Sequence, residues 1–495
     1  MPTVTRAHRE RSLALVRLWW VAPLLCAVVS AGMFVSTPTY GSPDAVVNLT
    51  TGWYDVHHGI PTASRINEPE FGYSGKAICY AFAPAQSALC RTDGRVTDIF
   101  SSRQRIANYP PFFFWIVGLG ELSGGAISRS VAPDGGRLFA LIACLALIFL
   151  AAWRLHRAQE RSAIWGAYLL AVPMATFLFP SANANGWEIA CALFFAATLL
   201  WRRAELLDGS TGYRPVWSIM IAGILLATAR PSGAVWLLTI AIVFVFWIRA
   251  WALRRAISLV AIAIAPGVAI SLVWSAMFPF IVRIGQPTLS LSPGALPSQL
   301  AASVQDVFAK TGEVWGVLGW LDTYPSALVL VALVGVLIYF FPTYAPTREH
   351  RRLLVAAIAL VFSASVVLEA LSWKAWPSWW QGRYSLPLLA GLALLLFSDP
   401  GHRERPRLFA LAAWATAFNT YMVCLNYWRY DYGIKNGFPI QIPNAAYGHI
   451  HTAGLYLIVL VLMVATAVLF AADRGHREEW ERASLKLPRA EAAAP

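Results

Sequence analysis

One carboxylate follows the first long apolar segment of the chain at a spacing that could serve acid–base chemistry. Asp44 stands in Ser42-Pro43-Asp44, within eight residues of the end of that segment. A general base must lie within hydrogen-bond reach of the hydroxyl that it deprotonates, and this position would keep Asp44 close to the surface of a bilayer. An Asp after a proline turn can equally cap a helix, so both interpretations stay open.

Cationic side chains at other positions could bind a phosphate. Arg383 and Tyr384 end an aromatic stretch at residues 379–384, and Arg230 and Lys374 are candidates of the same kind. The planar guanidinium group suits bidentate phosphate recognition. The alternative for Arg383 is a side chain that extends to the lipid headgroups.

Three more stretches adjoin apolar segments. Asn185 and Glu188 could reach a sugar hydroxyl, although residues 183–186 also have the composition of a simple tight turn. Tyr109 precedes two prolines at the start of an aromatic segment. The adjacent pair His57-His58 lacks the spacing of a helical zinc pair, so we expect no metal site there.

The elements that must position these residues follow from the spacing of arginine. Arginines gather in threes between successive apolar segments, at residues 6–11, 154–161, 202–214, 249–255, 348–352 and 403–407, and a basic tail covers 474–489. Lys and Arg beside a helix end resist translocation, so these groups predict cytoplasmic loops. The candidate residues above then fall together on the outer side.

The apolar segments predict an all-α polytopic membrane protein with about twelve transmembrane helices. They cover residues 12–36, 137–153, 162–180, 186–201, 216–229, 232–248, 256–277, 325–341, 353–372, 385–398, 408–425 and 453–472. A cytoplasmic N-terminus (1–11) and a cytoplasmic basic tail (473–495) would flank a single integral membrane domain (12–472). The first extracytoplasmic loop (37–136) would contain an interfacial helix at 110–127, because a crossing there would put every later arginine group outside. A second outer loop would cover 278–324.

Composition excludes several classes of protein. Hydrophobic residues make up 58% of the 495 and charged residues 13%, with a mean hydropathy of +0.55, which argues against a water-soluble enzyme. The net charge of +13 lies in the arginine groups and accompanies no nucleic-acid motif, so we expect lipid headgroups rather than nucleic acid as partner. There is no Walker or Gly-rich dinucleotide motif, hence no expected nucleotide cofactor.

Cysteine usage adds one expectation. Only Cys79 and Cys90 share a polar loop, and the other four cysteines lie in apolar segments. A loop outside the cytoplasm favours a Cys79–Cys90 disulfide over two free thiols.

The ordered set of short motifs resembles DUF2142, a family of bacterial multi-pass membrane proteins related to the GT-C type glycosyltransferases. The resemblance rests on Ser42-Pro43-Asp44, the cysteine pair and Tyr109-Pro110-Pro111, and continues through residues 183–186, Arg230-Pro231 and residues 382–387. The family commonly has Asp-Glu-Pro-x-His at the first motif, whereas this chain has Asp44-Ala45-Val46-Val47-Asn48 and retains only the Asp.

The resemblance implies an enzyme of the bacterial cytoplasmic membrane with a GT-C-like fold. It would transfer a sugar from a polyprenyl-phosphate donor to a cell-envelope glycan or lipid acceptor on the outer face. Asp44 would act on the acceptor, and Arg383, Arg230 and Lys374 would hold the lipid phosphate. Two alternatives stay open: a transporter or flippase of a lipid-linked glycan, and a non-catalytic envelope-assembly protein. The sequence names neither the sugar nor the acceptor, and leaves open the oligomeric state and the need for a divalent cation.

Overall fold

The structure, a computed structural model, describes residues 19–59, 80–88, 109–128, 130–169, 172–208, 214–248, 254–278, 296–344, 348–372, 380–398, 408–435, 438–439 and 449–485. The helices are α2 (Val21–Ser36), α3 (Ala45–His58), α4 (Phe112–Gly125), α5 (Ala132–Arg157), α6 (Arg161–Leu169), α7 (Pro173–Leu178), α8 (Ala184–Asp208), α9 (Arg214–Ala227), α10 (Gly233–Trp247), α11 (Arg254–Met277), α12 (Leu296–Lys310), α13 (Glu313–Gly316), α14 (Ala327–Tyr344), α15 (Arg348–Ser372), α16 (Leu386–Phe397), α17 (Leu408–Asp431) and α18 (His449–Leu485). A 3-10 turn, η3 (Gly382–Ser385), precedes α16, and β1 (Ile434–Lys435) pairs antiparallel with β2 (Phe438–Pro439).

Among the described residues, five helices are long and apolar enough to cross a membrane: α5, α8, α11, α17 and the 453–472 part of α18. The apolar stretches of the other apolar helices in this part of the chain are 10–17 residues long. These helices confirm a predominantly helical membrane protein. Each of the twelve apolar segments overlaps a helix or a helix pair, while the number of crossings stays a prediction.

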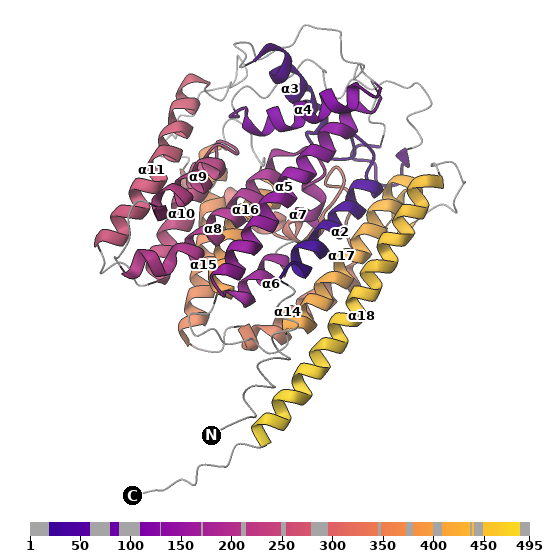
Figure 1. Ribbon diagram of the computed structural model, residues 1–495. Helices are drawn as coiled ribbons and strands as arrows, with labels where there is room; N and C mark the ends of the chain where they lie inside the picture. The colour runs from indigo at the N-terminus through magenta and orange to yellow at the C-terminus, as the bar shows by residue number, and fades with distance from the viewer. Residues whose placement is uncertain are drawn as a thin grey trace, which may run out of the picture.

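The helices pack around α8. Within its apolar segment 94% of the residues are buried, against 17% for α18, which runs along one edge (Figure 1). Helix α8 packs against α5, α9 and α16. A helix that is apolar on every side is stable when other helices surround it, and α8 fits that description.

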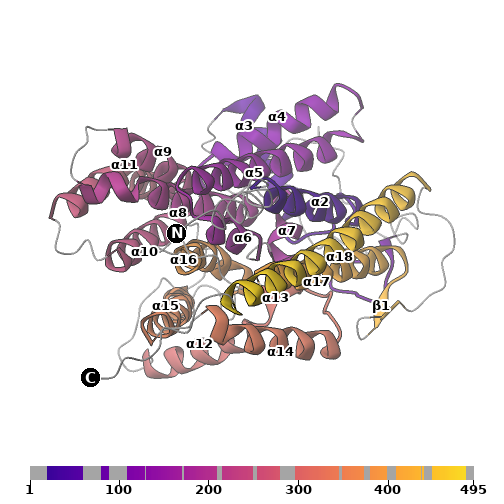
Figure 2. The same cartoon turned by 60° about the horizontal axis from the view of Figure 1, so that its bottom comes forward.

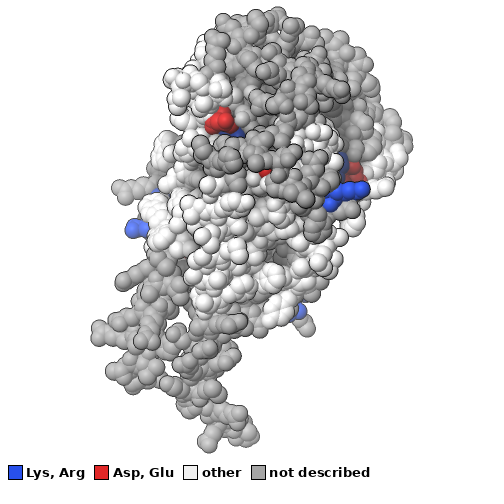
Figure 3. Space-filling view, turned by 90° about the vertical axis from the view of Figure 1, so that its right-hand side faces the viewer, with Lys and Arg blue, Asp and Glu red and all other residues white. Residues whose placement is uncertain are grey.

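Helices α3 and α4 lie together at one end of the bundle, at the top of Figure 1, and α4 packs on α5. Helices α12, α14 and α15 lie on the flank opposite α3–α5 (Figure 2). On the side that carries α18, few charged side chains are visible among the described residues (Figure 3). Exposed apolar residues of α18, such as Leu457, Leu460 and Val464, suit contact with lipid tails.

Two local features differ from the sequence expectation. The first loop contains α3 where no helix was expected, because its packing face is built from small and polar residues rather than from an apolar stripe. Gly52 of α3 meets Gly118 of α4 so closely that a side chain on either would clash with the backbone of the other helix. The segment expected over 162–180 is divided into α6 and α7, and Pro173 stands in the first turn of α7. The helix expected over 110–127 is α4, which begins directly after Pro111.

Candidate functional site

The link between α2 and α3, residues 37–44, is fixed by hydrogen bonds to its backbone. The side chain of Arg137, near the start of α5, donates to the carbonyl oxygens of Phe34 and Thr37 at 3.0 Å each and to that of Pro180 at 3.1 Å. A guanidinium group has five donors in a rigid plane, so one side chain ties the end of α2 to the turn after α7. The link therefore presents its residues in a defined position.

The end of the link is held by the turn between α7 and α8. Asn183 donates its side-chain amide to the carbonyl of Pro43 at 3.1 Å, and Ser42 donates to the carbonyl of Ser181 at 3.3 Å. The Asn183 oxygen in turn accepts the backbone N–H of Asn185 at 2.9 Å. Asn183 is thus the last residue before α8, which begins at Ala184, and its side chain supports the residues that precede Asp44.

Asp44 directly precedes α3, but its side chain does not cap the helix. Its backbone is in the left-handed region, with φ of 64° and ψ of −1°, and its side chain makes no capping hydrogen bond. Asp is one of the few residues that adopt this conformation readily. The carboxylate instead accepts a hydrogen bond at 2.9 Å on Oδ2 from Nη2 of Arg383. The capping interpretation of Asp44 therefore does not describe this structure.

Arg383 reaches Asp44 from the η3 turn. Two acids hold the backbone at the start of that turn and just before it: the partly buried Glu313 of α13 accepts the N–H of Gly382 at 2.8 Å, and the buried Glu369 of α15 accepts the N–H of Trp380 at 3.0 Å. The Arg383 side chain is 1% exposed, whereas that of Asp44 is 52% exposed. Arg383 is thus a buried cation beside a half-exposed carboxylate, and it does not extend outward as a headgroup anchor would.

A second buried ion pair joins Arg230, in the turn between α9 and α10, to Glu188 of α8. Arg230 donates to the side-chain oxygen of Asn185, to Glu188 at 3.4 Å and to the hydroxyl of Tyr109 at 3.0 Å. Ser232, in the same turn, donates to the other Glu188 oxygen at 2.7 Å. The Glu188 side chain is 0% exposed, and its carboxylate faces the charge of Arg230.

The ring of Tyr384 joins the two pairs. The guanidinium carbon of Arg230 lies 4.8 Å from its centroid, and that of Arg383 lies 5.5 Å from the same ring. The ring of Tyr109 lies 5.3 Å from the Arg230 guanidinium carbon. Cations over aromatic faces are attracted by the ring quadrupole. These contacts build one cluster from the two arginines, with Asp44 as its exposed acid.

Protonation of Tyr109 follows from its surroundings. Burial raises the pKa of the Tyr109 phenol above its ordinary value of 10, an effect that the Arg230 charge only partly offsets. The phenol therefore keeps its proton at neutral pH while its oxygen accepts from Arg230. It can donate to a ligand oxygen placed beside it.

The structure brings together seven of the residues that the sequence singled out, from five separate parts of the chain. They are Asp44, Tyr109, Asn185, Glu188, Arg230, Arg383 and Tyr384. Lys374, Cys79 and Cys90 lie outside the described residues. No group of three His, Cys, Asp or Glu side chains in the described ranges could hold a metal ion.

Ser232 and Glu313 support the cluster but were not among the residues that the sequence singled out. Ser232 could have been noticed from its position two residues after Arg230 in the same polar turn. Glu313 has no local signal, because its contact with Gly382 depends on how α13 packs against η3. A residue of this kind is found only from the tertiary structure.

A family model described as a predicted membrane protein, DUF2142, matches residues 26–392, well over half of the chain. The chain belongs to the DUF2142 family. No curated protein matches it, and no solved structure matches it. All seven clustered residues lie within the DUF2142 match, whereas α17 and α18 lie beyond it.

Proposed function

We propose that this DUF2142 protein is a membrane glycosyltransferase. It would transfer a sugar from a polyprenyl-phosphate donor to a hydroxyl of a cell-envelope glycan or lipid, at the outer face of the bacterial cytoplasmic membrane. The observation that carries the proposal is the exposed carboxylate of Asp44, held at 2.9 Å by the buried Arg383. When a hydroxyl replaces a phosphate at a carbon, one group must accept the hydroxyl proton and a cation must stabilise the leaving phosphate, and Asp44 and Arg383 would supply these two groups.

In the proposed reaction the acceptor hydroxyl gives its proton to Asp44, and its oxygen forms a bond to the anomeric carbon of the sugar. The bond from that carbon to the phosphate oxygen breaks, and its electron pair leaves with the polyprenyl phosphate. Arg383 would stabilise the negative charge that develops on this oxygen, a large contribution in a site that excludes water. Arg230 would hold Tyr109 in place for a hydrogen bond to the substrate.

The sidedness of the protein is part of the proposal. At the end of the bundle opposite α3 and α4, Arg154 of α5 contacts Thr198 of α8, and Arg203 pairs with Glu160 at 3.1 Å. These arginines belong to the groups that the positive-inside bias assigns to the cytoplasm. With that assignment both termini are cytoplasmic, about twelve helices cross the membrane, and the Asp44 cluster faces outward.

The test is sugar transfer in membranes from cells that produce the chain, measured with a labelled sugar. Asp44→Asn should lower the rate by at least about 100-fold, the usual contribution of a general base. Glu205→Gln is the control, because Glu205 also pairs with an arginine, Arg202, at 2.6 Å and is 34% exposed, but lies near the C-terminal end of α8. Full activity of Asp44→Asn would remove the proposed role of Asp44.

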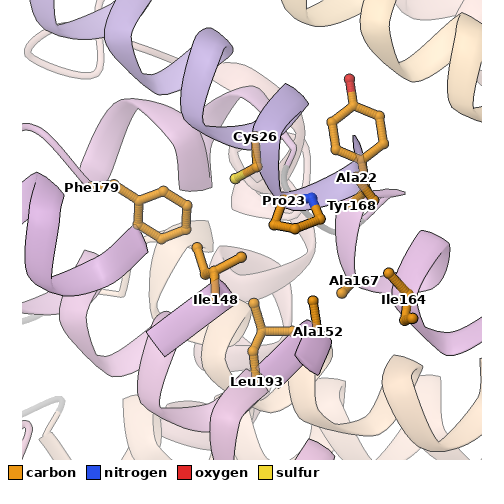
Figure 4. A pocket seen from close by; sticks show the side chains of 10 residues that line it. All are labelled: Ala22, Pro23, Cys26, Ile148, Ala152, Ile164, Ala167, Tyr168, Phe179 and Leu193. Atoms are coloured by element: carbon orange, nitrogen blue, oxygen red, sulfur yellow. The ribbon is translucent and has the colours of Figure 1, made fainter. Parts of the chain in front are cut away.

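A flippase of lipid-linked glycans is the second candidate, favoured by the break between α6 and α7, since transporters often contain discontinuous helices. Beside that break lies a pocket lined by apolar side chains and Tyr168 (Figure 4). Its volume is about 10 Å³, room for about one water molecule. That pocket is too small to hold a sugar, so it would not be the binding site of a transported glycan. A flipping assay in proteoliposomes separates the two.

A further inference from the structure

The two ion pairs of the cluster differ in how firmly their acids are held. Glu188 is fully buried, and both of its oxygens accept hydrogen bonds, from Arg230 and from Ser232. Asp44 is half-exposed and accepts one hydrogen bond, from Arg383, among the described residues. Leaving its place would therefore cost Asp44 far less than it would cost Glu188.

Arg383 has little free capacity for a ligand while Asp44 is bound. Its side chain is 1% exposed, and its charge is balanced by the Asp44 carboxylate. The buried Nε atom of Arg383 has no hydrogen-bond partner, so the guanidinium group has an unused donor beside the one that holds Asp44. A phosphate has enough oxygens to take both donors, as charge-assisted bidentate pairs do.

We propose that the Asp44 carboxylate occupies the phosphate position at Arg383 and that a phosphate-bearing lipid displaces it. The inference rests on the proposed function for the identity of the ligand. Displacement frees Asp44 from its cation at the moment when the donor is in place, and the free carboxylate can then accept the proton of the acceptor hydroxyl. The donor lipid therefore binds before the acceptor, and Asp44 becomes an effective base only afterwards.

The fixed backbone before Asp44 fits this displacement. The preceding link is held by Arg137 and Asn183 through its carbonyls, so the backbone stays fixed while the side chain turns. Rotation about the side-chain bonds alone can move a carboxylate by several ångströms. The movement needs no change in the helices.

The experiment measures binding of farnesyl phosphate, a short polyprenyl phosphate, to the purified full-length protein in detergent by titration calorimetry. Asp44→Asn removes the competing charge and should bind farnesyl phosphate about tenfold more tightly than the unmodified chain. Glu205→Gln, which removes the ion pair with Arg202 near the C-terminal end of α8, should leave the affinity unchanged, and Arg383→Gln should abolish binding. Asp44→Ser should bind more tightly as well, and it serves as a second variant if Asp44→Asn folds poorly.

Unchanged or weaker binding by both Asp44 variants would overturn the displacement. The proposed function is tested separately by the transfer assay. Loss of transfer by Asp44→Asn without tighter binding leaves the transferase proposal in place and removes the displacement. Tighter binding with full transfer supports the displacement and removes Asp44 as the base. If farnesol binds as tightly as farnesyl phosphate, Arg383 does not bind the phosphate group, and the inference is overturned.

Discussion

Neutralising Glu188 tests the buried half of the cluster. Glu188→Gln keeps the shape of the side chain and leaves an oxygen for Ser232, but it removes the charge that faces Arg230. The two side chains are 0% and 8% exposed and lie 3.4 Å apart. Removing one partner of a buried ion pair costs about 3–5 kcal/mol, because the other charge is left without compensation.

For Glu188→Gln we expect a loss near the lower end of this range. Arg230 keeps its hydrogen bonds to Asn185 and Tyr109 after the substitution, and the rings of Tyr109 and Tyr384 still face its guanidinium group. We therefore expect Glu188→Gln to lower the free energy of unfolding by about 3 kcal/mol.

The assay is reversible unfolding of the purified protein in mixed detergent micelles, followed by tryptophan fluorescence. Glu205→Gln is the matched control, because Glu205 pairs with Arg202 at 2.6 Å but is 34% exposed. Partly exposed pairs contribute about 0.2–1 kcal/mol. A second variant, Glu188→Gln combined with Arg230→Gln, should recover part of the loss, since neither charge is then left buried alone. A loss for Glu188→Gln no larger than that for Glu205→Gln would refute the reasoning.

Two further changes have expected outcomes. Gly186→Ala should lower the free energy of unfolding by about 1–3 kcal/mol, because a Cβ there would lie 2.6 Å from the carbonyl oxygen of Leu178. The control is Gly454→Ala, whose Cβ would meet no atom within 4 Å. This variant should be neutral or stabilising in the same unfolding assay. Burial raises the pKa of Glu313 above its ordinary 4.5 despite the Gly382 N–H, so its contribution to stability is full below about pH 4.5 and declines as the pH rises through the raised pKa. The free energy of unfolding should therefore fall less between pH 4.5 and 7 in Glu313→Gln than in the unmodified protein. An identical pH profile for the two proteins would contradict the raised pKa of Glu313.

The sequence by itself indicated the helical membrane fold and the residues worth following. Long apolar segments must bury their backbone polar groups in helices when lipid surrounds them, so composition and segment length suffice for the fold class. The spacing of the arginine groups assigned the polar turns to two opposite ends. It thereby grouped Asp44, Arg230 and Arg383 before any contact was known.

Only the tertiary structure decided which of these residues meet. Asp44 and Arg383 are 339 positions apart, and Arg230 and Tyr109 are 121 apart. The alternation of helices fixes the end at which a turn lies, but its neighbours around the bundle depend on side-chain packing between distant helices. Helix α3 was not predicted for a related reason. Its contact with α4 is made by glycines, so its sequence lacks the hydrophobic periodicity that indicates a helix. The charges could be located from the order of the chain, whereas their pairing depended on how the helices pack.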